Sequence, residues 1–423
     1  MKILVISRNA WDDTNSIGNT LTNFLQNLDN VEFANIYFRS TKPNNNVCRR
    51  YYRVTETEVI KKWFSPHKIG EEFELSKSDV NTETSKISKE KRLIRLVHKY
   101  GIKFAYKISN SVWYSKKWIN SNLDKFIKSF SPDLVVSFVK SAPQYYLTIK
   151  HLRENHNIPV FAWIADDEYT SLVRRNSRRE INNLRYILKE SAAVRGCSEE
   201  ICEYYNYNFG CNATPLYKGC EFSKEVKCSI NTPVNMVYAG NLLYGRLDIL
   251  KKIADALDKY TDENCTVRFE IYSNTQISLE DRLYFNNTKC TKYMGQRSYD
   301  IIKQCLSESD IVVHAESFKD EQILKTKYSF STKIIDCLQS GSVMLAIGPS
   351  EISSIKYAKK IPGAVVIDNI DCLEEKIGSI LDEVETFGER AKATREFAQK
   401  HHDIRLNAVD LSKTFNQIVK GED

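Results

Sequence analysis

The sequence predicts an α/β protein with two domains built on parallel sheets. Short apolar runs alternate along the chain with longer amphipathic runs, the pattern of parallel strands joined by helices. The alternation occurs in two series, separated by a polar stretch without periodicity that carries Pro233, so we place a linker at residues 220–233. With 423 residues, the chain is long enough to give each domain a core of its own.

The first series supplies four strands and three helices. The strands are expected where short apolar runs occur, at residues 2–7, 31–38, 133–139 and 158–165. The helices are expected where the spacing becomes amphipathic, at residues 17–28, 118–130 and 144–154. Residues 42–88 are polar and irregular, which predicts a loop-rich insertion.

The second series begins after the linker and continues to the end of the chain. Its strands are expected at residues 234–239, 267–272, 310–314, 343–347 and 364–367. Its helices are expected at residues 248–259, 299–307, 332–339, 371–384 and 404–419.

Bulk properties exclude several classes of protein. Hydrophobic residues make up 42% of the chain and charged residues 27%, which is ordinary for a globular protein in water. The apolar run that follows Lys2 has only five residues, too short for a signal peptide, and no run approaches the ~18 residues of a membrane span. We therefore expect a cytoplasmic protein that can also contact the inner face of the cell membrane. The eleven cysteines and seven histidines show no metal-ligand spacing, so no metal site and no cofactor is expected.

Residues 86–128 form a basic stretch with interleaved aromatic residues. It has twelve Lys and Arg against two acids, Glu90 and Asp124, and it includes Trp113 and Trp118. Such a stretch suits the surface of an anionic membrane, where basic side chains meet phosphates and Trp lies at the headgroups. A solvated helix face whose aromatic residues enter the core is the alternative. Nucleic acid is the least favoured partner, and none is expected.

The segment 328–349, Y-S-F-S-T-K-I-I-D-C-L-Q-S-G-S-V-M-L-A-I-G-P, carries the most specific pattern. Ser331 and Thr332 are good N-cap residues, and the free N–H groups behind them suit an anion such as a diphosphate. Asp336 lies one helical turn after Thr332, on the same side. Gly341 ends the helix before a buried strand. The arrangement suits a nucleotide, with the diphosphate at the helix start and ribose hydroxyls at the carboxylate.

This segment resembles the nucleotide-sugar motif of GT-B-fold glycosyltransferases of family 4 (glycosyl transferase group 1). Those enzymes carry an acidic residue five positions before a glycine, as Asp336 precedes Gly341 here, although the usual residue is Glu. In the family it binds the ribose, while the loop and helix start before it bind the diphosphate. The family also has a Glu eight positions earlier, where this chain has Tyr328. We take Glu316, in V-V-H-A-E-S-F, as the displaced carboxylate that contacts the donor sugar.

The resemblance also implies basic and glycine-containing donor contacts. The segment A-G-N-L-L-Y-G-R-L-D is similar to the family's G-x-L-x-x-x-K/R segment, so Arg246 is expected to neutralise the donor diphosphate together with Lys333. The family's second basic residue has no certain match, and Lys251 and Lys252 are its candidates. Gly18 corresponds to a glycine loop that faces the donor. The plain alternatives are a surface Arg at a helix start for Arg246 and an ordinary strand-to-helix turn for Gly18.

Three acids follow the predicted strand 158–165 and are assigned to the acceptor side. Asp166 or Asp167 would bind an acceptor hydroxyl, while simple helix capping is the alternative for these acids. Together with Glu168 they also imitate the D-x-D metal motif of the other glycosyltransferase fold, but that reading leaves Asp336 and Gly341 unexplained. For Glu316, a helix cap or a loop salt bridge is the alternative to sugar binding.

The resemblance implies a GT-B architecture in which two Rossmann-like domains face a central cleft. The domains are expected at 1–222 and 234–402, with a C-terminal helix at 403–423 returning to the first domain. The implied activity is transfer of a sugar from a nucleotide diphosphate to a hydroxyl acceptor, with retention and without metal. The acceptor would be a glycan or a lipid-linked glycan of a bacterial surface polysaccharide or glycolipid. Two alternatives stay open, a nucleotide-sugar 2-epimerase and a non-catalytic partner that binds glycan or another transferase.

Overall fold

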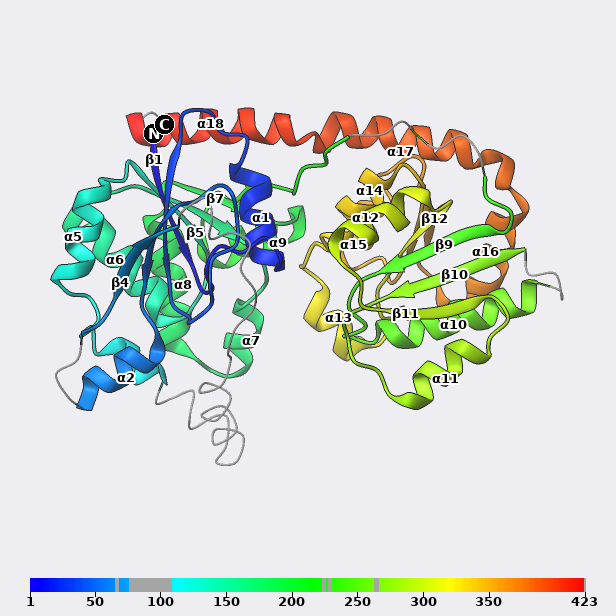
Figure 1. Ribbon diagram of the computed structural model, residues 1–423, viewed down its shortest axis with the longest axis horizontal. Coiled ribbons are helices and arrows are strands. Elements are labelled where there is room, and N and C mark those ends of the chain that lie inside the picture. Colours follow the sequence, from blue (N-terminus) through cyan, green and yellow to red (C-terminus); the bar gives the residue numbers. More distant parts are fainter. Residues whose placement is uncertain (65–67, 76–108, 223–225, 227–229, 262–265, 422–423) are drawn as a thin grey trace. The chain divides into compact units, whose positions relative to one another are not determined.

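The protein forms two compact units, each built around one sheet. The structure is a computed structural model that describes residues 1–64, 68–75, 109–222, 226, 230–261 and 266–421 (Figure 1). The first unit comprises Met1–Leu216 together with Ala408–Asp423, and the second comprises Tyr217–Asn407.

The sheet of the first unit has eight strands in the order β4-β3-β2-β1-β5-β6-β7-β8. All neighbouring strands are parallel except the β3–β4 pair. The strands are β1 (Lys2–Ser7), β2 (Glu32–Tyr37), β3 (Arg50–Arg53), β4 (Glu71–Glu74), β5 (Leu134–Phe138), β6 (Val160–Ile164), β7 (Ala193–Gly196) and β8 (Thr214–Pro215).

Helices connect these strands, and the last helix of the chain ends in this unit. They are α1 (Ser16–Leu25), α2 (Glu56–Phe64), α5 (Ser121–Phe130), α6 (Pro143–His156), α7 (Tyr169–Arg174), α8 (Arg178–Glu190), α9 (Glu199–Phe209) and α18 (Ile404–Lys420). From Ala408 onward α18 belongs to the first unit, where Phe415 meets Phe161 edge to face with ring centroids 5.0 Å apart. Asp410 also pairs with Arg195 at 3.0 Å.

The four strands and three helices predicted for this half are present, with ends shifted by a few residues. The residues 42–88, expected to be loop-rich, contain β3, α2 and β4, while 76–88 lie outside the described residues. These strands have only four residues each, too few to show a period. Helices α7, α8 and α9 were not anticipated either, because their sequences are polar and their burial depends on the sheet beside them.

The described part of the basic stretch contributes its tryptophans to the core. Trp113 and Trp118 are 2% and 0% exposed, and both rings meet Phe38 edge to face, with centroids 5.7 Å and 5.8 Å from it. The Trp118 indole N–H donates to the carbonyl of Trp113 at 3.0 Å. These two rings therefore pack inside the protein, as the core alternative predicted. Residues 86–108 of the stretch lie outside the described residues.

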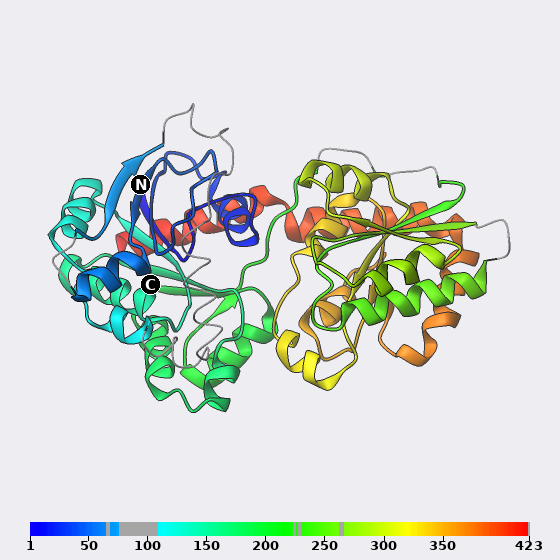
Figure 2. The same cartoon turned by 60° about the horizontal axis from the view of Figure 1, so that its bottom comes forward.

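The sheet of the second unit is parallel and has the order β11-β10-β9-β12-β13-β14 (Figure 2). Numbered within the unit this is 3-2-1-4-5-6, the order of a dinucleotide-binding Rossmann sheet. Its strands are β9 (Val234–Ala239), β10 (Val267–Tyr272), β11 (Thr291–Gly295), β12 (Ile311–Ala315), β13 (Val343–Ile347) and β14 (Val365–Ile367).

Helices cover both faces of this sheet. They are α10 (Arg246–Tyr260), α11 (Leu279–Asn287), α12 (Tyr299–Glu308), α13 (Asp320–Thr326), α14 (Lys333–Ser340), α15 (Ser353–Ala358), α16 (Leu373–Asp382) and α17 (Phe387–His402), with short 3₁₀ turns at η2 (Ile370–Cys372) and η3 (Val384–Thr386). Every strand and helix predicted for this half is present, whereas β11, α11, α13, α15 and α17 were not predicted.

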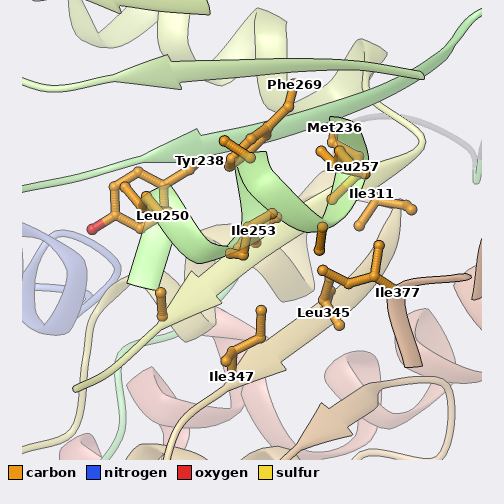
Figure 3. Packing of buried hydrophobic residues seen from close by; sticks show 14 of the residues in the cluster. Met236, Tyr238, Leu250, Ile253, Leu257, Phe269, Ile311, Leu345, Ile347 and Ile377 are labelled. Carbon is orange, nitrogen blue, oxygen red and sulfur yellow. The ribbon is translucent and has the colours of Figure 1, made fainter. Parts of the chain in front are cut away.

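Successive side chains of β9 point to opposite faces of the sheet and pack in two separate hydrophobic clusters. Met236 and Tyr238 belong to the cluster that also holds α10, whereas Val237 between them belongs to the cluster on the other face. Figure 3 shows α10 lying across the first cluster, with Leu250, Ile253 and Leu257 directed at the sheet. Their spacing of three and four residues is that of one helix face. The sheet is therefore buried on both faces at β9.

Among the described helices, none combines the length and the apolar character that a membrane span requires.

Candidate functional site

The candidate site lies at the carboxyl ends of β9 and β12 in the second unit. These two strands pair with each other, and the chain order reverses between them, with β10 and β11 on one side and β13 and β14 on the other. Open parallel sheets bind their ligands in the crevice at such a reversal. The loop after β9 leads to Arg246, and the residue after β12 is Glu316.

Arg246 and Glu316 form a buried ion pair. The Arg246 Nη2 group donates to both carboxylate oxygens of Glu316, at 2.7 Å and 2.9 Å, and the two residues are 7% and 2% exposed. The remaining guanidinium donors are also bonded, Nε to the Ala315 carbonyl and Nη1 to Asn241 Oδ1. Burial lowers the pKa of Arg246, but the Glu316 carboxylate outweighs it and the net shift is upward. Arg246 therefore stays charged, and it is not the surface residue of the plain alternative.

Two glycines in the loop after β9 allow close contacts with other parts of the site. A Cβ on Gly240 would lie 1.9 Å from Cε and 2.0 Å from Nζ of Lys333, so the missing side chain leaves room for that ammonium group. Gly245 has φ +75°, and a Cβ there would lie 2.6 Å from the Ser317 hydroxyl. The left-handed conformation at Gly245 lets the chain turn directly into α10, which begins at Arg246.

Lys333 is the second cation of the site. It opens α14, and its Nζ donates to the hydroxyl of Tyr238 at 2.8 Å. Burial, and next the positive charge of Arg246, lower the pKa of Lys333 to about 7. Protonation of Lys333 is thus unfavourable in the absence of an anion, although the Glu316 carboxylate offsets part of the cost.

His314 lies beneath these groups in β12. The ring is fully buried, its Nε2 is 3.5 Å from Glu316 Oε1, and neither ring nitrogen has a hydrogen-bond partner among the described residues. Burial, with Lys333 and Arg246 next, lowers the pKa of His314 well below its usual value, so the ring is neutral. Because Arg246 and Glu316 cancel one another, protonation of Lys333 leaves one net positive charge in the cluster. The arrangement suits an anion.

The start of α14 supports the same conclusion with one correction. Thr332 occupies the N-cap position, but its hydroxyl makes no capping bond, and the N–H of Ser331 donates to the hydroxyl of Ser354 at 2.9 Å. The expected side-chain cap is therefore wrong, because Thr332 has helical backbone angles instead of the extended ones that a capping residue adopts. The N–H groups of Ile334 and Ile335 donate to the carbonyls of Ser331 and Thr332 at 3.0 Å and 3.1 Å, so they are already bonded within the protein. The positive charge at this end of the helix therefore comes chiefly from the Lys333 ammonium group.

Asp336 lies on the first turn of α14 among lysines. Burial raises the pKa of Asp336, whereas Lys218, Lys333 and Lys303 lower it, and the net shift is upward. Lys218 was not among the predicted site residues. Burial lowers its pKa, partly offset by Asp336. It lies just before the predicted linker at residues 220–233, and its interaction with Asp336 depends on the fold.

The structure also bears on the predicted second basic residue. Lys251 Nζ pairs with Asp281 of α11 at 2.6 Å and is therefore engaged away from Arg246, and Lys252 is exposed. Lys333 is the lysine that interacts with Arg246. Tyr238 and Asn241, which position Lys333 and Arg246, were not predicted, because a Tyr in a buried strand and an Asn in a turn carry no specific signal.

Gly18 and the acids after β6 belong to the first unit. A Cβ on Gly18 would lie 2.0 Å from the carbonyl oxygen of Asp12, and its N–H donates to the Asn15 side chain that caps α1. Close packing of the preceding loop thus already requires glycine there, so its predicted contact with the donor remains a prediction.

The predicted acceptor-side acids occupy different environments. Asp166 is exposed, with its carboxylate 3.8 Å from Lys140, and Asp167 accepts a bond from the Thr170 N–H at the start of α7. Glu168 pairs with Lys140 at 3.2 Å and accepts from the Ser141 N–H at 2.8 Å. Lys140 follows β5 and the acids follow β6, so these groups meet at the carboxyl edge of the sheet. Asp166 is the exposed acid of the three, whereas Asp167 and Glu168 each accept a backbone N–H group.

The sequence matches none of the protein-family models and none of the curated proteins. Solved structures are similar over the whole chain. Sucrose-phosphate synthase from Thermosynechococcus elongatus has a TM-score of 0.62 at 12% identity, covering 100% of both chains. HepE from Anabaena, solved in complex with UDP, has a TM-score of 0.62 at 11% sequence identity, and the match covers 99% of this chain and 100% of HepE. WaaG, a glycosyltransferase involved in lipopolysaccharide biosynthesis, has a TM-score of 0.56 at 10% sequence identity, and the match covers 99% of this chain and 100% of WaaG. The chain has the fold of GT-B glycosyltransferases, as its sequence motifs predicted.

Proposed function

We propose that this protein is a glycosyltransferase that moves a sugar from a nucleotide-diphosphate donor to a hydroxyl acceptor. The observation that carries the proposal is the group Arg246, Glu316 and Lys333 at the strand-order reversal of a Rossmann sheet. The similar structures support it, because HepE is described in complex with UDP and WaaG as a glycosyltransferase. A UDP-sugar is accordingly the proposed donor.

The proposed roles follow from charge. Departure of a nucleoside diphosphate develops negative charge on its phosphate oxygens, and fixed cations stabilise that charge best where water is excluded. Protonated Lys333 is proposed to supply the net positive charge, and Arg246, whose charge is paired with Glu316, is proposed to be a second fixed cation beside the phosphates. Ser331 and Thr332 are proposed to add hydroxyl and backbone dipoles at the start of α14. Because side chains supply this positive charge, the proposed reaction needs no metal ion.

Carboxylates are assigned to the neutral parts of the donor. Asp336, one turn into α14, is proposed to accept hydrogen bonds from the ribose hydroxyls. Glu316, held by Arg246, is proposed to contact the sugar. In the ligand-free structure Glu316 makes the salt bridge that was the alternative to sugar binding, so its contact with the sugar remains a proposal. Retention of anomeric configuration is proposed from the resemblance to family 4.

The acceptor is proposed to be a glycan or lipid-linked glycan of a bacterial surface polysaccharide or glycolipid. WaaG, with its role in lipopolysaccharide biosynthesis, is the neighbour that supports this class. Asp166 and Asp167 in the first unit are proposed to bind the acceptor hydroxyl, and Asp166 is the more accessible of the two. Contact of the basic stretch with an anionic membrane belongs to the same proposal.

The test measures protection from thermal unfolding by a panel of nucleotides and nucleotide sugars. UDP and one UDP-sugar are expected to raise the unfolding midpoint of the wild type. In the Asp336→Ala variant the affinity for UDP is expected to fall about 10–100-fold, the cost of losing bonds to a charged acceptor. The control is Glu375→Ala, which removes an exposed helical carboxylate on α16 and should bind UDP as the wild type does.

Turnover separates the proposal from its alternatives. Release of UDP from the protective UDP-sugar, increased by a glycan acceptor, supports a transferase. Protection without turnover would instead indicate a non-catalytic binding protein, and recovery of an epimerised UDP-sugar would indicate the epimerase. Absence of protection by every nucleotide would contradict the donor site.

A further inference from the structure

A second group of chemically reactive side chains lies in the first unit, on the helices that flank β5 in sequence. Asp124 of α5 faces His151 and His156 of α6, with its Oδ1 2.8 Å from His151 Nε2 and 3.0 Å from His156 Nε2. One ligand atom from each of the three residues lies within 4.8 Å of the others. We propose that these residues form a binding site for one divalent transition-metal ion of the zinc type.

The donor set fits this class of ion. Two imidazole nitrogens and one carboxylate oxygen are the ligands that zinc accepts in sites with three protein ligands and one water. Zinc–nitrogen bonds of about 2.0–2.1 Å place tetrahedral ligands roughly 3.3 Å apart. The observed separations of 2.8 Å and 3.0 Å therefore need only small side-chain shifts. One carboxylate oxygen now contacts both ring nitrogens, and an ion between these three atoms would take the place of those two contacts.

Exposure of the three residues leaves room for a fourth ligand. The side chains of His151 and His156 are 12% and 11% exposed, so the surrounding helices hold both rings in place. The Asp124 side chain is 37% exposed, which opens the cluster to water on one side. The two rings meet nearly edge to face, with centroids 5.2 Å apart, and are therefore not stacked. Both Nε2 atoms point to the same carboxylate oxygen.

A neighbouring amide can orient one of the ligands. Asn155 Nδ2 lies 2.9 Å from His151 Nδ1, the ring nitrogen on the far side from Asp124. Metal binding at Nε2 moves the ring proton to Nδ1, which then donates to the amide oxygen after the amide rotates. Such partners typically contribute 10–100-fold to metal affinity. Asn155 would therefore hold the metal-bound ring of His151 in its orientation.

The spacing of the histidines in the sequence is not that of a zinc module, so the prediction of no metal site did not anticipate this cluster. His151 and His156 are five residues apart, at the end of one helix, and Asp124 is distant in the chain. The ion would link α5 to α6. Its role is therefore stabilisation of the first unit, independent of the donor site in the second unit and of the proposed transfer reaction.

The test is titration of metal-depleted, untagged protein with Co²⁺ and then Zn²⁺. The wild type is expected to bind one equivalent of Co²⁺, with weak visible absorption of nitrogen and oxygen ligation, and Zn²⁺ should displace it. Zn²⁺ should also raise the unfolding midpoint by a few degrees. The His151→Gln/His156→Gln double variant should lose both effects. The control is His401→Gln, which alters an exposed histidine on α17 and should behave as the wild type.

Asn155→Ala serves where the double variant fails to fold, because it leaves all three ligands in place. Its affinity for Zn²⁺ is expected to fall 10–100-fold. Two results would overturn the proposal. One is no stoichiometric binding by the wild type, or binding unchanged in the double variant. The other is an intense sulfur-to-metal charge-transfer band, which would assign the ion to cysteines.

Discussion

Replacing Glu316 with Gln is expected to lower the free energy of unfolding of the second unit by about 3–5 kcal/mol. The change keeps the shape of the side chain but leaves Arg246 buried without its counter-charge and Lys333 close to it. Arg246 would keep its charge in a buried position without a partner, and Lys333, which also loses the favourable effect of Glu316, would give up its proton more readily. Urea unfolding of the wild type and the variant at pH 7 measures the difference.

A double-mutant cycle distinguishes the ion pair from simple loss of packing. Arg246→Met alone should cost a similar amount, since it leaves the Glu316 carboxylate buried and unpaired. The double variant Arg246→Met/Glu316→Leu should recover most of the loss, because no uncompensated charge remains. The matched control is Asp281→Asn, which breaks the partly exposed pair with Lys251 and should cost about 1 kcal/mol or less. Additive single effects would contradict the interpretation.

Lys333→Met is expected to stabilise the ligand-free protein at pH 6 by roughly 1–3 kcal/mol while abolishing nucleotide binding. The pKa of Lys333 is about 7 in the folded protein, against roughly 10.4 in an unfolded chain. Between these two values the unfolded chain binds the extra proton, so the stability of the wild type rises with pH. Below pH 7 both states carry the proton and the buried charge costs its full amount. Met removes that cost, so the advantage of the variant should shrink from pH 6 to pH 9 in urea unfolding.

Nucleotide affinity should depend on the same proton. A bound diphosphate favours protonated Lys333, so the affinity of the wild type for UDP should fall as the pH rises above about 7. Gly240→Ala tests position separately from charge. Its Cβ would lie 2.0 Å from Nζ, so the lysine must move while its charge remains. We expect this variant to bind UDP more weakly with little loss of stability. Unchanged affinity for UDP would contradict a contact between Lys333 and the diphosphate.

Much of the architecture follows from local pattern. Strands such as β9 and β13 are short apolar runs between polar loops, so burial on both faces of a parallel sheet is visible in the residues themselves. Gly341 ends α14 in the left-handed conformation that its position predicted. Short or polar elements escaped prediction. The strand β3 contains only R-Y-Y-R, and its assignment depends on pairing with β2 and β4.

The sequence by itself determined which residue types this protein places after its strands, and hence the candidates Arg246, Glu316, Lys333 and Asp336. Only the tertiary structure decided how they pair. It bonds Arg246 to Glu316, places Lys333 over Gly240 and brings Lys218 beside Asp336. It also brings Asp124 to His151 and His156. The reason is physical, because hydrogen bonds and charge interactions act over a few ångströms, and distances between residues far apart in sequence are set by the packing of sheets and helices.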